Sequence, residues 1–355
     1  MAKDCYYRKF ADGKFFNGSG CGNEIATEKP MVRQFIIDSL TYWVEEYHID
    51  GFRFDLMGLY DIDTVVAIRD RLDELESKLG KRLLSYGEPW WALPPAPWIV
   101  PADTSNLSLL PDKVGVFNSS YRDGLRGDNH LSRGFLQGMA VSLSAVMSGI
   151  EGASDKREGV VFKLNSPSQN VCYMSAHDNY TLYDQLKATM PSEREIKIAT
   201  KFGAFFVMSS LGLAFMQAGE EFCRTKQMND NSYNAGDDIN ALDWNRKDAY
   251  CDISDYYQGL IRIRRHNPVF RNLSTAKEQF EWLAVRSAWG ALAYRIGDYI
   301  YIANPTDGDA YVDLSRFGQL ERLADIDTAN LYCIDKLSGD VKIPAKNLAI
   351  LRKTN

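Results

Sequence analysis

Three short apolar segments in the first half of this chain each lead into a carboxylate, with helix-forming segments between them. Asp55 is the last residue but one of the segment 49–56, and Glu88 is the last residue of the segment 82–88. Asp178 lies two residues after the segment 170–176. Apolar residues at helical spacing mark the intervening segments. Strands alternating with helices indicate parallel βαβ units, and functional side chains at strand C-termini are typical of a (β/α)₈ barrel.

The alternation continues for about five βα units. We expect strands at 49–56, 82–88, 113–117, 170–176 and 211–216, and helices at 28–47, 61–79, 132–147, 193–210 and 255–265. A closed barrel of this type needs eight strands, so the sequence predicts about the last five βα units of a (β/α)₈ TIM barrel. The alternative, an open doubly wound sheet, would usually carry a glycine-rich phosphate loop after an early strand, and we find none.

The pattern changes near residue 274. Short apolar segments at 292–295, 299–303, 310–314 and 348–351 are separated by Gly, Asp and Asn turns, with no competing helical period. This is typical of a small antiparallel β domain. We therefore expect two domains, residues 1–273 and residues 274–355.

Composition narrows the classes of partner. The 355 residues carry 41 basic against 47 acidic side chains, a net charge of −6, with a pI near 5.4. Such a chain has no global attraction for nucleic acid or anionic membranes. The N-terminal residues 1–10 contain no apolar core of a signal peptide, so we expect a cytoplasmic protein. The six cysteines show no spacing of a metal site or a disulfide framework.

The residues at the strand ends suggest acid–base chemistry on sugars. Arg53 lies two positions before Asp55, so the two-residue period of a strand places both on one face. Carboxylates that converge on one site repel one another, which favours the protonated form of at least one, while a neighbouring arginine favours ionisation of another. Retaining glycoside hydrolysis needs that combination. The alternative is that each carboxylate caps the helix that follows it.

Local motifs are more specific than this spacing. In chain order they read Gly51-Phe52-Arg53-Phe54-Asp55, Gly87-Glu88-Pro89-Trp90 and Ser175-Ala176-His177-Asp178-Asn179. They resemble three of the four signature regions of the α-amylase superfamily. The wider segments at 50–58, 18–24 and 232–244 resemble type I pullulanases, which hydrolyse α-1,6-glucosidic branches in pullulan, limit dextrin or glycogen with retention. The resemblance covers essentially the whole chain.

The resemblance implies roles for five strand-end residues. Asp55 would be the nucleophile, Glu88 the general acid/base and Asp178 the transition-state stabiliser. Arg53 would orient Asp55 and balance its charge, and His177 would hydrogen-bond the sugar that precedes the scissile bond.

Three further residues are implied to contact the α-glucan. Trp90 would stack on a sugar ring on the leaving-group side, although packing at the base of its loop is an alternative. Tyr233 and Asp237 resemble loop residues that reach the glucan, although the surrounding Asn-Ala-Gly-Asp is also ordinary turn chemistry.

The chain departs from the family pattern in several places. The first signature strand and an upstream Y-N-W-G-Y segment are absent and would precede Met1, so we expect a fragment, for which a separately encoded N-terminal half is a candidate partner. Ser119 and the pair Trp91-Ala92 also depart from the family pattern. These departures bear on the preferred linkage and subsites more than on the reaction type.

The alternative functions are those of an isoamylase-like or branching enzyme, or of an inactive glucan-binding remnant. The chemistry calls for no cofactor, and no metal ligands can be placed.

Overall fold

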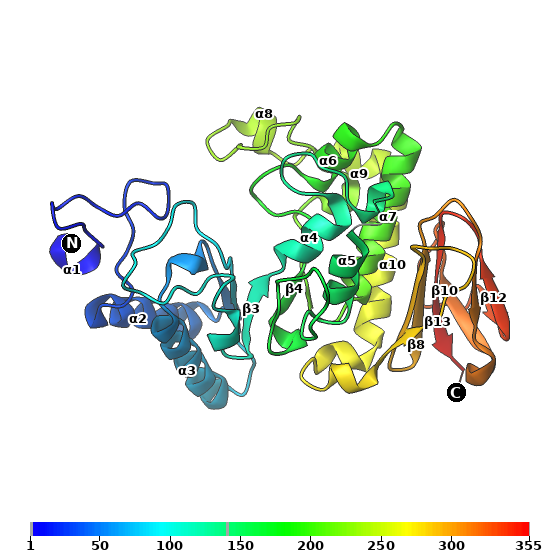
Figure 1. Cartoon of the computed structure of the whole chain (residues 1–355), viewed down its shortest axis with the longest axis horizontal. Helices are drawn as coiled ribbons and strands as arrows, with labels where there is room; N and C mark the ends of the chain where they lie inside the picture. Colours follow the sequence, from blue (N-terminus) through cyan, green and yellow to red (C-terminus); the bar gives the residue numbers. More distant parts are fainter. Residues whose placement is uncertain (1–2, 140–141, 355) are drawn as a thin grey trace. The chain divides into compact units, whose positions relative to one another are not determined.

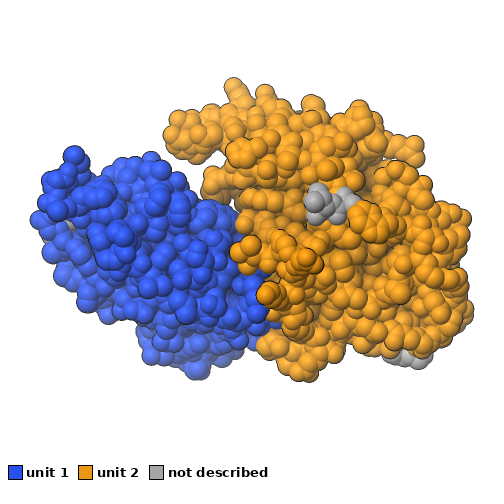
Figure 2. Space-filling view, viewed as in Figure 1, with its two compact units in different colours: residues 1–117, 162–171 blue, residues 118–161, 172–355 orange. Residues whose placement is uncertain are grey.

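The computed structural model describes residues 3–139 and 142–354 (Figure 1). The chain divides into two compact units (Figure 2). Unit 1 comprises Met1–Phe117 and Phe162–Val171, and unit 2 comprises Asn118–Val161 and Cys172–Asn355. These units are defined by contacts, whereas the predicted division at residue 274 separates two kinds of secondary structure, and that division stays a prediction.

Helices occupy the first three quarters of the described chain. They are α1 (Lys3–Tyr6), α2 (Pro30–Tyr47), α3 (Ile62–Leu79), α4 (Ser119–Arg126), α5 (Leu143–Ile150), α6 (Leu182–Thr189), α7 (Glu193–Ser209), α8 (Asp237–Asn240), α9 (Asn245–Ala249) and α10 (Cys251–His266). Among the residues that the structure describes, no helix is long and apolar enough to cross a membrane.

The strands fall into one parallel and one antiparallel group. The first comprises β1 (Gly51–Phe54), β2 (Leu84–Gly87), β3 (Val114–Phe117), β4 (Asn170–Cys172) and β5 (Leu213–Ala214). The second comprises β6 (Phe280–Leu283), β7 (Leu292–Ile296), β8 (Tyr299–Asn304), β9 (Ala310–Asp313), β10 (Leu320–Ala324), β11 (Asp335–Leu337), β12 (Asp340–Ile343) and β13 (Asn347–Lys353).

The first five strands form one sheet in the order β1-β2-β3-β4-β5. The pairs β1/β2, β2/β3 and β3/β4 are parallel, as the alternation of strands and helices predicted. The register pairs Phe54 with Gly87, so β1 and β2 end level with each other. The residues that follow these two strands, Asp55 and Glu88, therefore leave the sheet at the same edge.

Helices α2 and α3 pack together within unit 1. Their contact is a cluster of buried aliphatic side chains that includes Leu40, Val44 and Leu72. Helix α3 begins where the side chain of Asp61 accepts the backbone N–H of Thr64, at 3.0 Å, a typical N-cap. Both helices agree with the predicted segments 28–47 and 61–79.

The antiparallel strands form a six-stranded sheet, β11-β10-β13-β8-β7-β6, and a two-stranded sheet, β12-β9. Side chains alternate between two buried faces of the larger sheet. Tyr294 and Tyr301 belong to the core cluster that contains residues of α7 and α10, with Tyr301 packing edge-on against Phe205. Ile300 and Ile302 belong to the cluster that includes residues of β9 and β12. Both faces are covered, and β8 is therefore buried along its whole length, with apolar or aromatic residues up to Ala303.

One predicted helix is wrong in its first half. Within the predicted segment 132–147, the described residues form a short 3₁₀ turn, Phe135–Gln137, and α5 begins only at Leu143. Gly138 ends the turn in the left-handed region, with φ of 88°, which an α-helix cannot continue through. Residues 140 and 141 of the predicted segment lie outside the described residues.

The predicted strand at 170–176 is shorter than expected, since β4 ends at Cys172. Beyond it, side chains from other elements take the place of a strand partner. The buried guanidinium of Arg126 donates to the carbonyl of Met174, and the hydroxyl of Ser175 donates to Glu220. The periodicity also missed α4 and α6, and strands β6, β10, β11 and β12.

Candidate active site

Arg53, Asp55 and Glu88 form a connected group at the end of β1 and β2 in unit 1. One guanidinium nitrogen of Arg53, Nη1, donates to Asp55 Oδ1, and the other, Nη2, donates to Glu88 Oε1. The side chains of Arg53 and Asp55 therefore lie on the same face, as the two-residue period predicted. A carboxylate oxygen of Asp55 and one of Glu88 lie within 4.8 Å of each other. A planar guanidinium suits this bridging role because its donors point in fixed directions.

The two carboxylates differ sharply in exposure. The side chain of Asp55 is 63% exposed, whereas that of Glu88 is 5% exposed. The second oxygen of Glu88, Oε2, accepts the backbone N–H of Leu56 at 2.8 Å. One carboxylate is thus open to an incoming ligand, and the other is enclosed and held on two sides.

Close packing of backbone fixes the loops that carry these carboxylates. The N–H of Gly58 donates to the carbonyl of Glu88 at 2.9 Å. A Cβ at Gly58 would lie 2.5 Å from the carbonyl oxygen of Trp90, and a Cβ at Gly87 would lie 2.8 Å from that of Phe54. Only a residue without a Cβ lets the backbone come this close at both positions, which explains why Gly58 and Gly87 are glycines.

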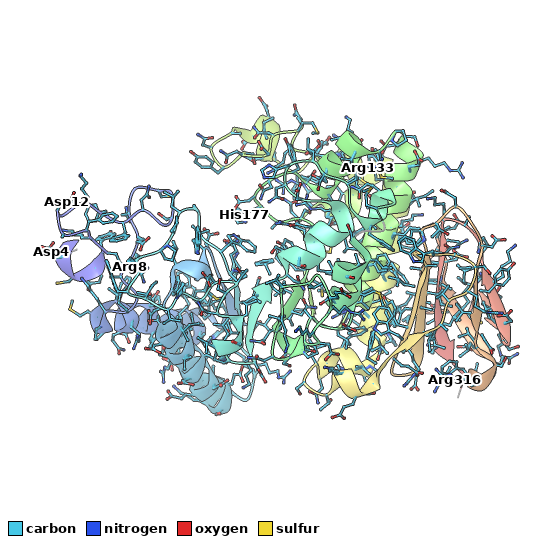
Figure 3. The ribbon with its side chains drawn as sticks, viewed as in Figure 1. Asp4, Arg8, Asp12, Arg133, His177 and Arg316 are labelled. Carbon is cyan, nitrogen blue, oxygen red and sulfur yellow. The ribbon has the colours of Figure 1, made fainter. Side chains whose placement is uncertain are left out.

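An N-terminal segment supports the same loops. The carbonyl of Gly18 accepts the N–H groups of Ala92 and Leu93, each at 3.0 Å. Buried Arg8 (Figure 3) forms an ion pair with Glu24 at 3.2 Å and donates to the carbonyl of Leu59 at 2.8 Å. The motif at 18–24 therefore braces the loops that follow both β1 and β2.

Trp90 is half-buried and lies against Phe117, with ring centroids 6.3 Å apart and tilted planes. Arg53 lies over the same Phe117 ring, at 5.8 Å. The structure thus gives Trp90 a packing contact at the base of its loop. Its role as a platform for a sugar ring stays a prediction.

His177 and Asp178 lie in unit 2, in the loop that follows β4 (Figure 3). His177 Nε2 and Asp178 Oδ1 are 3.4 Å apart, and both side chains are more than half exposed. The carbonyl of His177 accepts a 3.2 Å hydrogen bond from the ammonium group of Lys226. Both side chains are therefore open to solvent while their backbone is held.

Tyr233 and Asp237 lie on one loop of unit 2 around α8 (Figure 1). Tyr233 is 79% exposed, and Asp237 opens α8 and is exposed too. The side-chain amide of Asn240 donates to the carbonyls of Ser232 and Ala235, at 2.7 and 2.8 Å. The side chain of Asn240 therefore closes this turn, and the contact of Tyr233 and Asp237 with a glucan stays a prediction.

Sequence reasoning missed Glu220. This side chain is fully enclosed, follows β5, and accepts the hydroxyl groups of Ser175 and Tyr257. Burial, ahead of every other effect, raises its pKa from 4.5 to about 7. A carboxylate shortly after a strand was the signal that could have found it, as it found Asp55, Glu88 and Asp178.

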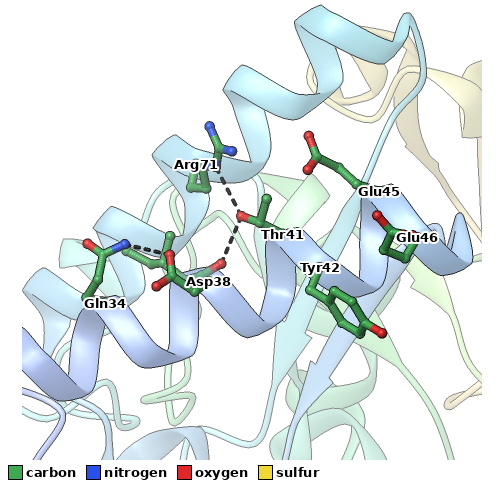
Figure 4. Close-up of a pocket in the computed structure, with 8 residues that line it drawn as sticks. Gln34, Asp38, Thr41, Tyr42, Glu45, Glu46 and Arg71 are labelled. Carbon is green, nitrogen blue, oxygen red and sulfur yellow. Dashed lines mark hydrogen bonds between the residues drawn. The ribbon is translucent and has the colours of Figure 1, made fainter.

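A groove of about 470 Å³ runs along α2 and α3 on unit 1 (Figure 4). Its lining is mostly polar, with Asp38, Glu45 and Glu46 from α2. Arg71 donates to the hydroxyl of Thr41 across it, at 3.1 Å. None of the predicted site residues lines this groove.

Comparison with known proteins agrees with the geometry. The pullulanase of Bacillus subtilis is 36% identical over 297 residues, which is 82% of this chain and 40% of that protein. The structure of a pullulanase from Bacillus acidopullulyticus superposes with a TM-score of 0.88 and 32% identity, covering 98% of this chain and 43% of that one. The structure of type I pullulanase from Bacillus subtilis in complex with maltose superposes with a TM-score of 0.86 and 31% identity. The match covers 99% of this chain and 50% of that one.

A rice chloroplastic isoamylase matches more distantly, at 25% identity over 309 residues, covering 73% of this chain and 36% of that protein. No protein-family model matches the chain. The chain spans about half or less of the length of the relatives it matches.

The parallel strands, the carboxylates at their ends and these matches define a member of the α-amylase superfamily, with part of a (β/α)₈ barrel followed by a β domain. Within that superfamily, the chain belongs with the type I pullulanases. The predicted fold class and the predicted family are both confirmed.

Proposed function

We propose that this chain carries the catalytic machinery of a debranching glycosidase that hydrolyses α-1,6-glucosidic linkages of pullulan, limit dextrin or glycogen with retention of configuration. One observation supports the reaction type above all others. Asp55 and Glu88 have carboxylate oxygens within 4.8 Å of each other, joined by Arg53. Retaining glycosidases separate their two carboxyl groups by about 5 Å, whereas inverting enzymes need roughly 6.5–9.5 Å to admit a water.

The difference in exposure between Asp55 and Glu88 supports the roles that the resemblance implies. Exposed Asp55 attacks the anomeric carbon, forming a covalent bond as the glycosidic C–O bond breaks. Enclosed Glu88 gives its proton to the departing oxygen. Glu88 then takes a proton from water, whose oxygen bonds to the anomeric carbon and releases Asp55.

The remaining predicted residues bind and stabilise. We assign Asp178 to stabilisation of the oxocarbenium-like transition state and His177 to the sugar before the scissile bond. Trp90, Tyr233 and Asp237 contact the α-glucan. The maltose complex of the Bacillus subtilis pullulanase supports an α-glucan as ligand. These steps use carboxylates and water only.

The test is release of reducing ends from pullulan by the purified 355-residue chain. Asp55→Asn and Glu88→Gln should each abolish release, and the first product should be the α-anomer by NMR. Asp50→Asn is the matched control, because Asp50 precedes the same strand but its side chain is 81% exposed and pairs with Lys81. Activity that survives both substitutions would refute the assignment.

The same assay addresses the alternatives. The isoamylase match makes an isoamylase-like specificity one alternative. Parallel assays on glycogen and on pullulan distinguish it from the specificity of a pullulanase. A branching enzyme would transfer chains without a net gain of reducing ends. We also propose a separately encoded N-terminal half as a partner. Activity that appears only on co-expression with that half would establish it. The cytoplasmic location stays a prediction.

A further inference from the structure

Glu220 occupies a fully buried position in unit 2, on the short turn Glu220–Phe222 that follows β5. Its two oxygens accept two hydroxyl groups. Ser175 Oγ donates to Oε2 at 2.5 Å, and the Tyr257 hydroxyl of α10 donates to Oε1 at 3.0 Å. An ionised carboxylate, whose two oxygens only accept hydrogen bonds, suits both of these donors.

Ser175 lies two residues before His177 and three before Asp178. Lys226 lies six residues after Glu220, and its ammonium group donates a 3.2 Å hydrogen bond to the carbonyl of His177. Lys226 is itself fixed, because its backbone N–H donates to Asp184 Oδ2 at 2.7 Å. The segment 220–226 therefore holds the His177–Asp178 segment at two points.

We propose that Glu220 is a positioning residue for this reaction. Through Ser175 it fixes the backbone that presents His177 and Asp178, with Lys226 as the second anchor. The inference rests on the function proposed above, and it adds a specific residue that does not touch the glucan.

The charge state of Glu220 links this anchor to pH. Burial above all, together with the charge of neighbouring Glu221, raises its pKa to about 7. The hydroxyls of Ser175 and Tyr257 and the positive charge of Arg126 on α4 act in the opposite direction. Below about pH 7 one oxygen of the acid carries a proton and the carboxyl group loses its negative charge, so it becomes a weaker acceptor for the two hydroxyls. The anchor on Ser175 is therefore strongest above this pH.

Glu220→Gln tests the proposal because an amide cannot accept both hydroxyls. Ser175→Ala removes the other end of the bond, and the double variant closes a thermodynamic cycle. Glu221→Gln is the matched control, since Glu221 is the adjacent residue and its side chain accepts the backbone N–H of Gly219 in the same turn. All variants are compared in the full chain.

The first measurement does not depend on activity. Amide hydrogen exchange of the segment 175–178, measured at one pH in the full chain, should be faster in Glu220→Gln and Ser175→Ala than in the wild type and Glu221→Gln. Unchanged exchange of this segment in folded Glu220→Gln overturns the inference, whether or not the chain hydrolyses pullulan.

The second measurement uses turnover of pullulan. Glu220→Gln and Ser175→Ala should each lower kcat by about ten- to a hundredfold with little change in KM, as misplacement of reacting groups does. The double variant should be no worse than either single one. Additive losses would mean that the two residues act separately and would overturn the inference. Absence of turnover in the wild type would count against the proposed function, while hydrogen exchange of the segment 175–178 still decides the role of Glu220.

Discussion

The backbone N–H of Leu56 donates a 2.8 Å hydrogen bond to Glu88 Oε2. The turn that begins one residue after Asp55 thus holds the second carboxylate as well, and Arg53 joins the two from the strand side. The geometry of the pair is therefore built into β1 and its turn, and several consequences can be measured.

Arg53→Lys should lower kcat/KM on pullulan by about a hundredfold, the scale of a misplaced catalytic group. A lysine ammonium is a single point charge and cannot reproduce two donors in fixed directions toward Asp55 and Glu88. Steady-state kinetics measure the effect, with circular dichroism as the check on folding. Activity close to wild type would show that charge alone suffices.

Gly58→Ala should destabilise the chain by about 1–3 kcal/mol, the usual cost of forcing a group into a packed site. The new Cβ would lie 2.5 Å from the carbonyl oxygen of Trp90, which is backbone and cannot move aside cheaply. Gly236→Ala is the control, because a Cβ there meets nothing within 4 Å. Urea unfolding should separate the two variants, and equal stabilities would contradict the expected clash.

The stability of the protein should fall as pH rises from about 5 to about 7, in part because of Glu220. The pKa of Glu220 is raised from 4.5 to about 7 by burial, so in this window the folded chain binds more protons than the unfolded chain. Stability therefore decreases with pH where the unfolded state has already lost the proton. Urea unfolding at several pH values should show a flatter profile for Glu220→Gln than for wild type and Glu221→Gln. An unchanged profile would show that Glu220 does not titrate there.

Tyr233→Ala should raise KM for pullulan about three- to tenfold, which corresponds to about 1 kcal/mol of stacking, and leave stability unchanged. The ring of Tyr233 is 79% exposed, so little folding energy depends on it. Tyr332→Ala offers a comparison, since Tyr332 is 83% exposed but precedes β11 of the antiparallel sheets. A loss of stability in Tyr233→Ala, or an equal KM change in both variants, would argue for a structural role.

Much of this arrangement follows from local sequence. Carboxylates at strand ends predicted Asp55 and Glu88, and the two-residue period predicted that Arg53 shares a face with Asp55. The placement of these side chains is predictable because it depends on neighbours in the chain or on the level ends of paired strands. The predicted helix at 132–147 failed because helical periodicity ignored Gly138, whose positive φ ends the turn.

The contacts of Glu220 could not be derived in the same way. Its partners Ser175 and Tyr257 are 45 and 37 residues away along the chain, and no periodic pattern relates them. The bracing of Ala92 and Leu93 by Gly18 is of the same kind. Such contacts depend on the tertiary packing of loops, which a single sequence does not encode in any local signal.

The pairing of Phe54 with Gly87 also sets where this chain can change length during evolution or engineering. Because side chains alternate between faces, adding or deleting one residue within β1 would turn either Arg53 or Asp55 away from its partner while the rest of the sheet stayed in place. The segment 94–100, beyond the residues that Gly18 holds, has no strand register to preserve. New specificity is therefore best sought by lengthening that segment, with the strands kept at their present length.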